Sequence, residues 1–279
     1  MKQRIEVIGG NGLIGTSIKN VSKNIEIRDW GINPNSYGFF DLMDENSWGP
    51  ILSSNPKKVI LLSWPGLPNY NQDFHILENL IMSIKFLKML CKTKVKKIVS
   101  AGTCYEYGLS EGEQFEDSFL KPVTKYGLAK NWLRTYLEIE ANRNKINWCW
   151  VRIFYPYSEN SKKPTLYSAL MQAIKNNEKT FKIGSGKQIR DFIHVEDAAK
   201  QIIELTTNNN AKGIYNCGSG EPMTISTFVE SIIKSNNSNI NIVLNHYKDR
   251  DFEPFACWAN MKKYNDLLRL SEGIKFNNI

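Results

Sequence analysis

Long apolar segments are missing from this chain of 279 residues. Its longest aliphatic run covers only positions 59–62, whereas a helix needs ~20 apolar residues to span a bilayer. The first six residues include charged side chains and lead into a glycine-rich segment, which is not the pattern of a signal peptide. We therefore expect a cytoplasmic protein without membrane association.

Cysteine is scarce, with five widely spaced residues that form no Cys-x-x-Cys pair. An odd number at such spacing does not suggest a disulfide framework, and it does not match the pattern of a zinc site. The sequence predicts free thiols in a reducing compartment and no bound metal. The five are Cys91, Cys104, Cys149, Cys217 and Cys257.

No stretch of the chain concentrates its positive charge. Lysine and arginine total 36 against 28 acidic residues, which gives a net charge of +8. The basic residues are spread along the sequence, and none of the aromatic-plus-basic modules of nucleic-acid-binding proteins occurs. We expect no DNA or RNA partner, but a basic surface of this kind favours small anionic ligands.

The composition is that of a globular protein, with 42% hydrophobic and 23% charged residues. Short apolar runs alternate with longer amphipathic segments in the first half of the chain. This alternation predicts an α/β fold, in which a parallel sheet has helices on both faces. The expected strands are 5–8, 25–29, 39–42, 58–63, 97–100 and 146–154, and the expected helices are 13–20, 71–91 and 124–142.

After about residue 156 the pattern changes, and helical segments are separated by shorter strands. This is typical of a smaller α/β lobe packed on the first. We expect a larger domain of residues 1–155 and a smaller lobe of residues 156–279, with some crossing of the chain between them. The expected helices of this lobe are 164–174, 195–206 and 226–235, and its expected strands are 213–216 and 240–244.

A glycine-rich loop joins the first expected strand to the first helix. Gly9, Gly12 and Gly15 have the spacing of a dinucleotide-binding loop. The first permits a tight turn, the second lets a pyrophosphate approach the helix N-terminus, and the third lets the helix pack on the sheet. The loop predicts a doubly wound Rossmann sheet that binds NAD(P)(H). The predicted contacts in the loop are Gly9, Asn11, Gly12, Leu13, Ile14 and Gly15.

An acidic residue stands where the adenosine ribose of such a cofactor is expected. Asp29 ends the second expected strand, twenty residues after Gly9. Its carboxylate accepts hydrogen bonds from ribose hydroxyls and repels a 2′-phosphate, so it favours NAD(H). Arg28 is the one nearby cation that the sequence indicates. Asp41 and Leu42, after the third strand, are expected near the adenine.

Tyr126 and Lys130 form a Tyr-x-x-x-Lys pair within the expected helix 124–142. The i, i+4 spacing places the phenol and the ammonium on one face of the helix. Because a lysine charge favours the phenolate, we expect the pKa of Tyr126 to lie below its ordinary value of about 10. A phenol in this setting acts as a general acid or base.

With three further motifs, the chain resembles the extended short-chain dehydrogenase/reductases, the nucleotide-sugar epimerase/dehydratase family. Thr103 lies five residues before Gly108 of a Tyr-Gly pair, as the catalytic Ser or Thr of the family does. Residues 190–197 match the family's Arg-Asp-Phe-x-His-Val-x-Asp signature, and residues 215–220 match its Tyr-Asn-x-Gly-x-Gly element. The resemblance covers nearly the whole chain.

The resemblance implies a site and its ligands. Thr103, Tyr126 and Lys130 match the catalytic triad, and the last two also contact the NAD(P)(H) cofactor. The implied substrate is a nucleotide-diphosphate sugar. Further implied cofactor contacts are Ser63, Trp64 and Ile153, where Ser63 and Trp64 replace two alanines and crowd the nicotinamide end. Implied substrate contacts are Thr103, Tyr105, Tyr155, Arg190 and Arg250.

Two positions separate the reactions of the family. Its 4,6-dehydratases carry Asp-Glu after the catalytic threonine, whereas this chain has Cys104 and Tyr105, which do not supply that acid and base. Residues 102–107 resemble the corresponding segment of 4-ketoreductases of the CDP-abequose synthase type. Tyr155 stands where many epimerases carry Asn.

The resemblance therefore implies reduction of the 4-keto group of a 4-keto-6-deoxy nucleotide sugar, for deoxysugar and surface polysaccharide biosynthesis. The alternatives are a nucleotide-sugar 4-epimerase with tightly bound NAD and a 4-dehydrogenase. A non-enzymatic member of the family would lack part of the triad, which is intact here.

The resemblance also implies a homodimer that associates through helices 71–91 and 124–142, with a monomer as the alternative. We expect His75 at the surface or in this interface. His194 is expected to make a structural hydrogen bond, and Asp191 and Asp197 to orient neighbouring loops.

Overall fold

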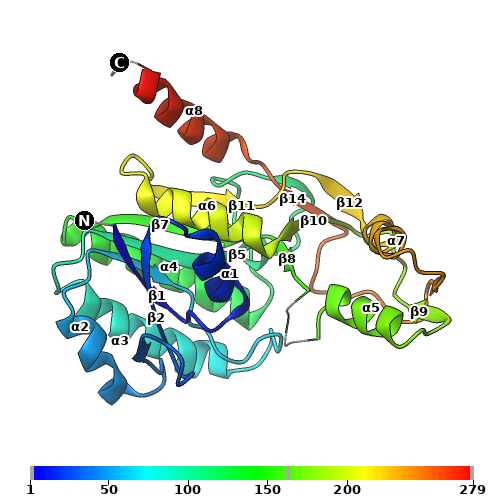
Figure 1. The fold of residues 1–279 in the computed structure, drawn as a ribbon, viewed down its shortest axis with the longest axis horizontal. Coiled ribbons are helices and arrows are strands. Elements are labelled where there is room, and N and C mark those ends of the chain that lie inside the picture. The colour runs from blue at the N-terminus through cyan, green and yellow to red at the C-terminus, as the bar shows by residue number, and fades with distance from the viewer. Residues whose placement is uncertain (1–2, 160, 162–163, 277–279) are drawn as a thin grey trace.

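Seven parallel strands make the largest sheet of the structure, a computed structural model that describes residues 3–159, 161 and 164–276 (Figure 1). The strands are β1 (Arg4–Ile8), β2 (Glu26–Gly31), β3 (Gly38–Phe39), β4 (Lys58–Leu61), β5 (Lys97–Thr103), β7 (Asn147–Ile153) and β11 (Gly213–Cys217). Their order is β11-β7-β5-β4-β1-β2-β3. The order reverses at β1, and ligands of doubly wound sheets bind beyond the carboxyl ends of the strands at such a point.

Helices cover both faces of this sheet. One face carries α1 (Leu13–Val21), α6 (Val195–Thr207) and the start of α8 (Lys262–Phe276). The other carries η1 (Glu45–Trp48), α2 (Gly49–Ser53), the π-helical segment η2 (His75–Leu80), α3 (Ile81–Leu90) and α4 (Lys125–Arg143). Neighbouring strand residues alternate between the two cores: Val59 joins one and Ile60 the other.

A smaller lobe lies beyond one end of the sheet, where Figure 1 shows α5 and α7 beside β9. Its five-stranded sheet consists of β6 (Gly112–Gln114), β8 (Tyr155–Tyr157), β10 (Ile189–His194), β12 (Pro222–Thr224) and β14 (Ala256–Ala259). Its other elements are α5 (Leu166–Lys175), α7 (Ile225–Ser235), β9 (Thr180–Lys182) and β13 (Asn241–Val243).

The chain crosses between these parts more than once. α6 and β11 follow residue 155 but belong to the large sheet layer, while β6 precedes it and pairs with β14. The division of the chain after residue 155 stays a prediction.

The predicted fold class, a doubly wound α/β Rossmann sheet, is confirmed. Differences are local: the helix expected at 71–91 begins at His75, and β5 extends three residues further than predicted, to Thr103. The strands β6, β8, β9, β10, β12 and β14 and the helices α2 and α8 were not predicted. Most of these strands have only three or four residues, which is too short to show a period of two.

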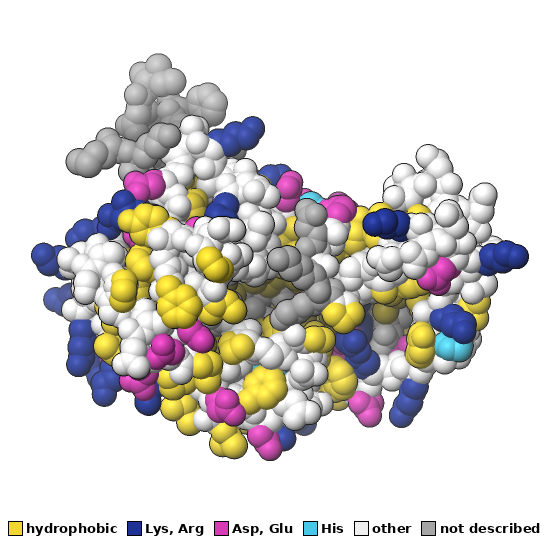
Figure 2. Space-filling model, turned by 60° about the horizontal axis from the view of Figure 1, so that its bottom comes forward, with side chains coloured by type: hydrophobic (Ala, Val, Ile, Leu, Met, Phe, Trp, Pro, Cys, Tyr) yellow, Lys and Arg dark blue, Asp and Glu magenta, His cyan; other side chains and the backbone are white. Residues whose placement is uncertain are grey.

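The cysteines lie in the interior of the fold. All five cysteines are free and buried. Among the described residues, no group of three or more His, Cys, Asp or Glu side chains is arranged for a metal. Within the same residues, no helix is long and apolar enough to cross a membrane. Figure 2 shows Lys and Arg side chains distributed over both lobes of the visible face.

Candidate active site

The glycine-rich loop follows β1 at the carboxyl edge of the large sheet. Gly9 has a φ of +85°, and a Cβ there would lie 2.6 Å from the backbone nitrogen of Ser63, so the turn requires glycine. Gly12 is the exposed N-cap of α1 and has no side-chain cap. The first N–H groups of α1 are thus available to a phosphate. The Asn11 side chain accepts a 2.9 Å hydrogen bond from Ser36, which ties the loop to the segment after β2.

Asp29 lies on β2 beside this loop, because β1 and β2 pair in parallel. Its carboxylate accepts from the Tyr37 N–H at 3.3 Å and forms a 2.9 Å ion pair with Lys19 of α1. The prediction that Arg28 is the one nearby cation is therefore wrong, because the second turn of α1 brings Lys19 to Asp29. Arg28 points to the other side of the strand and pairs with Glu26 at 2.7 Å.

The other predicted cofactor contacts lie along the same edge. Leu42, Ser63 and Lys130 line one cavity of about 20 Å³. Asp41 accepts a 2.9 Å hydrogen bond from the Met43 N–H and thereby shapes the turn after β3. Leu13 and Ile14 begin α1 and are half-buried, while Ile153 is buried at the end of β7.

Three predicted catalytic residues come together at the start of α4. Thr124 caps this helix by accepting from the Gly127 N–H at 3.0 Å, and the Tyr126 N–H donates to the Tyr70 carbonyl at 2.9 Å. Gly127 allows the segment η3 (Cys104–Glu106) to approach α4 closely, since a Cβ there would lie 2.5 Å from the Tyr105 carbonyl oxygen.

The side chains of Thr103, Tyr126 and Lys130 are all buried at this point. The residues are 5%, 7% and 3% exposed, respectively. Thr103 ends β5 and interacts with the Tyr126 hydroxyl, while Lys130 donates to the Ala101 carbonyl at 2.9 Å. The arrangement excludes most water from the phenol.

Burial governs the protonation of this pair. It raises the pKa of Tyr126, with the Thr103 hydroxyl acting in the opposite direction. It lowers the pKa of Lys130 to about 7, against the charge of Glu106. The predicted lowering of the Tyr126 pKa is wrong for this structure, because removing the phenolate from water outweighs any help from the lysine. The phenol is protonated at neutral pH, as a proton donor must be.

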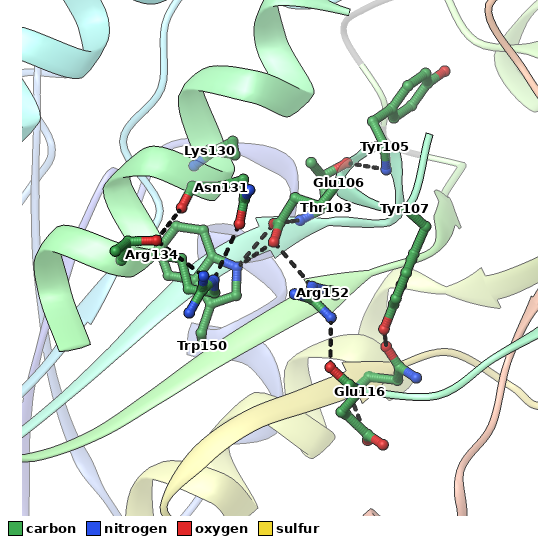
Figure 3. Close-up of polar contacts among 12 residues, drawn as sticks. Thr103, Tyr105, Glu106, Tyr107, Glu116, Lys130, Asn131, Arg134, Trp150 and Arg152 are labelled. Atoms are coloured by element: carbon green, nitrogen blue, oxygen red, sulfur yellow. Dashed lines mark hydrogen bonds and ion pairs between the residues drawn. The ribbon is translucent and has the colours of Figure 1, made fainter. Parts of the chain in front are cut away.

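Glu106 organises the segment around Thr103. Its buried carboxylate accepts from the Thr103 N–H at 2.9 Å, from Trp150 Nε1 at 2.8 Å and from Arg152 Nε at 2.9 Å. Figure 3 shows these donors converging on Glu106 from β5 and β7. Arg152 also donates to the Glu116 carbonyl at 2.9 Å and is 0% exposed. This network fixes the backbone that carries Thr103.

Trp64 lies under the predicted catalytic pair. The Lys130 ammonium is 4.2 Å from the centroid of the indole ring, and the rings of Trp64 and Tyr126 meet edge to face at 6.0 Å. The indole N–H donates to His75 Nδ1 at 3.0 Å. His75 is 0% exposed, so its predicted place at the surface or in an interface is wrong. His75 is the first residue of the π-helical segment η2 and is one of its buried residues.

Glu253 connects the predicted substrate residues. Its carboxylate accepts from the Tyr105 hydroxyl at 2.7 Å, from Arg190 at 3.0 Å and from Arg250 at 2.8 Å. Burial alone would raise the pKa of Glu253, but these hydrogen bonds and charges hold it below its ordinary value. Tyr155, another predicted substrate residue, adjoins this group through Arg190, whose guanidinium lies 5.1 Å from the Tyr155 ring centroid.

An aromatic wall lies between these residues and Tyr126. The rings of Tyr70 and Tyr105 stack at 4.6 Å, and Phe252 lies 6.1 Å from Tyr70. Tyr70 and Tyr105 are 5.8 and 6.2 Å from the Tyr126 ring. The candidate site therefore contains a cluster of aromatic side chains, with arginines at one end and the Tyr126–Lys130 pair at the other.

Two residues of the family signature that lie outside the candidate site, Asp191 and His194, have structural roles. Asp191 is 0% exposed and accepts from the backbone of Ser219, Gly220 and Ala259, which ties β10 to the following loop and to β14. His194 caps α6 and contacts Glu159 at 3.2 Å.

Four residues of the candidate site were not predicted from the sequence: Lys19, Tyr70, Glu106 and Glu253. Glu253 carried one signal, since it follows Arg250 by three residues and pairs with it. Glu106 lies within the motif that identified Thr103, but its partner Arg152 comes from another strand. Nothing in the local sequence indicates such a pairing.

The residues at the sheet edge fit a dinucleotide. The tight turn at Gly9 and the uncapped start of α1 suit a pyrophosphate, and the carboxylate of Asp29 suits ribose hydroxyls. Lys130 has a single protein acceptor, the Ala101 carbonyl, among the hydrogen bonds of the described residues. Its remaining N–H groups suit the hydroxyls of a second ribose.

Comparison with known proteins agrees with this geometry. The chain is 28% identical over 270 residues to dTDP-6-deoxy-L-talose 4-dehydrogenase (NAD(+)) of Aggregatibacter actinomycetemcomitans. This match covers 91% of this chain and 98% of that protein. It is 27% identical over 261 residues to dTDP-4-dehydro-6-deoxyglucose reductase of Escherichia coli, with coverage of 83% and 81%.

Solved structures show the same fold. UDP-N-acetylglucosamine 4-epimerase from Methanobrevibacter ruminantium M1 superposes with a TM-score of 0.82 at 24% identity, over 96% of this chain and 92% of that chain. UDP-glucuronic acid 4-epimerase from Bacillus cereus, in complex with UDP-glucuronic acid and NAD, gives 0.81 at 20% identity, over 96% and 93%. The model of the NAD dependent epimerase/dehydratase family matches residues 5–218. The sheet, the glycine-rich loop and this match together show that the chain belongs to the NAD-dependent epimerase/dehydratase family.

Proposed function

We propose that the protein is an NAD(H)-dependent oxidoreductase that acts at carbon 4 of a 6-deoxy nucleotide-diphosphate sugar and works as a 4-ketoreductase. The observation that carries this proposal is the buried cluster of Thr103, Tyr126 and Lys130 beside Cys104 and Tyr105. Burial raises the pKa of the Cys104 thiol and of the Tyr105 phenol, so neither supports the acid–base elimination of water.

The side chains of Thr103, Tyr126 and Lys130 suit proton delivery to a carbonyl oxygen. The glycine-rich loop, Asp29 and Lys130 would hold NADH, which would supply the hydride for carbon 4 of the sugar and become NAD. The Tyr126 hydroxyl gives its proton to the oxygen on that carbon, and the Thr103 hydroxyl donates a hydrogen bond to the same oxygen. Lys130 supplies positive charge next to Tyr126. The burial of all three side chains keeps water from competing for the proton.

The arginine end suits a diphosphate. Arg250 is 57% exposed at its side chain, whereas Arg190 is buried behind Glu253. Guanidinium groups bind phosphate oxygens in pairs of hydrogen bonds. The aromatic wall between the arginines and Tyr126 suits the apolar face of a 6-deoxy sugar, which has a methyl group in place of a hydroxymethyl group.

Two relatives support reaction at carbon 4. The names of the A. actinomycetemcomitans and E. coli proteins describe a 4-dehydrogenase and a reductase of 4-dehydro sugars, both carried on dTDP. The match to the A. actinomycetemcomitans protein covers 98% of the length of that protein. These are opposite directions of one type of reaction, so dTDP-linked 6-deoxy sugars are the first substrates to test.

A 4-epimerase is the second candidate, because the solved structures that share the fold include 4-epimerases. An epimerase retains its cofactor and returns it to its starting state after each turnover. A reductase consumes one NADH per sugar. Cofactor stoichiometry therefore separates the two functions.

The test is incubation of the purified protein with NADH and a panel of 4-keto-6-deoxy sugars carried on dTDP, CDP, GDP and UDP. We expect stoichiometric loss of NADH absorbance with one member, and formation of NADH from NAD with the corresponding 6-deoxy sugar. Conversion of a sugar into its 4-epimer without net change in NADH would establish the epimerase instead.

Tyr126→Phe is the matched control, because it keeps the ring and removes the proton donor. We expect turnover to fall about 10²-fold or more, the range of general acid–base catalysis, with NADH still bound. Turnover close to that of the wild type would exclude Tyr126 as the acid.

A further inference from the structure

Trp64 and His75 form a fixed pair beneath the catalytic residues. The indole N–H is a donor only, so His75 Nδ1 must accept its hydrogen bond at 3.0 Å. The His75 proton then resides on Nε2, which lies 2.9 Å from the Asn69 carbonyl oxygen and donates to it. Both ring nitrogens are occupied, and burial lowers the pKa of His75. His75 is therefore a neutral anchor for the indole.

The anchored indole presents its face to Lys130. The ammonium is 4.2 Å from the ring centroid, within the range of a cation–π interaction, and Trp64 is 8% exposed. The Trp150 ring is further away, at 5.8 Å. Trp64 is thus the nearer of the two indole rings that face this ammonium.

Few other groups influence the charge on Lys130. The titratable side chains around it are Glu106 of η3, Tyr126 of α4 and His75 of η2. Glu106 is committed to Arg152 and Trp150. The pKa of His75 is lowered and that of Tyr126 is raised, so neither changes its charge close to neutral pH.

We propose that Trp64, held in place by His75, is a positioning residue that keeps the ammonium of Lys130 charged and directed at the cofactor and Tyr126. The proposal rests on the proposed function only in that Lys130 meets the cofactor. Most of the buried surroundings disfavour the charged lysine, whereas the π face of the indole favours it. The pKa of Lys130, about 7, lies where a modest change in this balance alters its charge.

The test compares Trp64→Leu with Trp64→Phe. Leucine keeps an apolar side chain but removes the π face, and phenylalanine keeps a π face but removes the N–H donor. The readout is the affinity for NADH as a function of pH, followed by fluorescence. Wild-type affinity should fall as pH rises through the pKa of Lys130.

In Trp64→Leu this fall should move to lower pH by roughly half a unit to one and a half units, the range of a cation–π contact. Trp64→Phe should retain the wild-type position. Lys130→Met should remove this pH dependence and so assign it to Lys130. The variants are checked for wild-type melting curves, and Trp64→Met takes the place of the leucine variant if the latter is unstable, because methionine also lacks a π face.

Two results would overturn the proposal. One is an unchanged pH dependence in Trp64→Leu, and the other is an equal displacement in Trp64→Leu and Trp64→Phe, which would indicate packing alone. NADH binding needs no sugar, so failure of the 4-ketoreductase assay leaves this test intact.

Discussion

Tyr126 and Lys130 respond oppositely to the same burial. Burial disfavours the charged form of each group, so it raises the pKa of Tyr126 and lowers the pKa of Lys130. A phenol that keeps its proton and an ammonium that loses its proton near neutral pH thus lie side by side. The Tyr-x-x-x-Lys spacing predicts the pairing, but the direction of each pKa depends on how much water the fold removes.

We expect Asp29 to govern the choice between NADH and NADPH. Its carboxylate faces like charge if a 2′-phosphate approaches, which costs several kcal/mol unless a cation intervenes. The structure places such a cation, Lys19, at 2.9 Å. We expect NADH to bind at least as tightly as NADPH, because Lys19 is already neutralised by Asp29.

Asp29→Ser should release Lys19 for a 2′-phosphate and raise the affinity for NADPH relative to NADH by about tenfold, the effect of ~1.4 kcal/mol. The matched control is Asp29→Ser combined with Lys19→Ala, which should lose this gain. Titration of both cofactors into each protein measures it. A tenfold preference of the wild type for NADPH would show that Asp29 is not the ribose partner.

At the scale of elements, the end of β5 depends on a buried ion pair from β7. Arg152 and Glu106 are both 0% exposed at their side chains and lie 2.9 Å apart. The same carboxylate accepts from the Thr103 N–H. Removing one partner of a buried pair leaves an uncompensated charge, whereas exposed pairs contribute little.

Glu106→Gln should therefore lower the free energy of unfolding by about 3–5 kcal/mol, because Arg152 remains charged and buried. The matched control is Asp197→Asn, since the Asp197–Lys200 pair is 56% and 55% exposed and should contribute less than ~1 kcal/mol. Urea unfolding curves measure both. Equal, small losses in the two variants would contradict the role assigned to Glu106.

At the scale of the whole molecule, η2, α3 and α4 present an apolar surface. We call it the α3–α4 face, and it consists of the exposed side chains Leu77, Ile81, Met89, Trp132 and Ile139. These helices pack side by side on one face of the large sheet. Figure 2 shows hydrophobic side chains exposed among charged ones over the lobe that carries this sheet.

We expect the protein to be a homodimer through the α3–α4 face. Trp132 is 49% exposed, and Trp132→Glu should place a charge in the interface and yield a monomer. The matched control is Leu244→Glu, which changes a residue of similar exposure, 47%, in the smaller lobe. Light scattering coupled to gel filtration gives the masses. A monomeric wild type, or dissociation by both variants, would refute this interface.

The sequence alone determined the fold class and the centre of the site. The glycine spacing at 9–15, the alternation of strands and helices and the Tyr126–Lys130 pair are local patterns. Local patterns are readable because they depend on a residue and its near neighbours along one element. For the same reason the strand β2 and its acidic residue Asp29 could be predicted, although the strand continues two residues further, to Gly31.

Only the tertiary structure decided which side chains of different elements meet at that site. Lys19 reaches Asp29 from α1, Arg152 reaches Glu106 from β7, and His75 turns inward to hold Trp64. These pairs are separated by 10, 46 and 11 positions along the chain, and each joins two different elements or loops, so no spacing within one element encodes them. Burial, which sets the charge of Tyr126 and Lys130, likewise arises only when the helices close over the sheet, since it measures the water that packing removes.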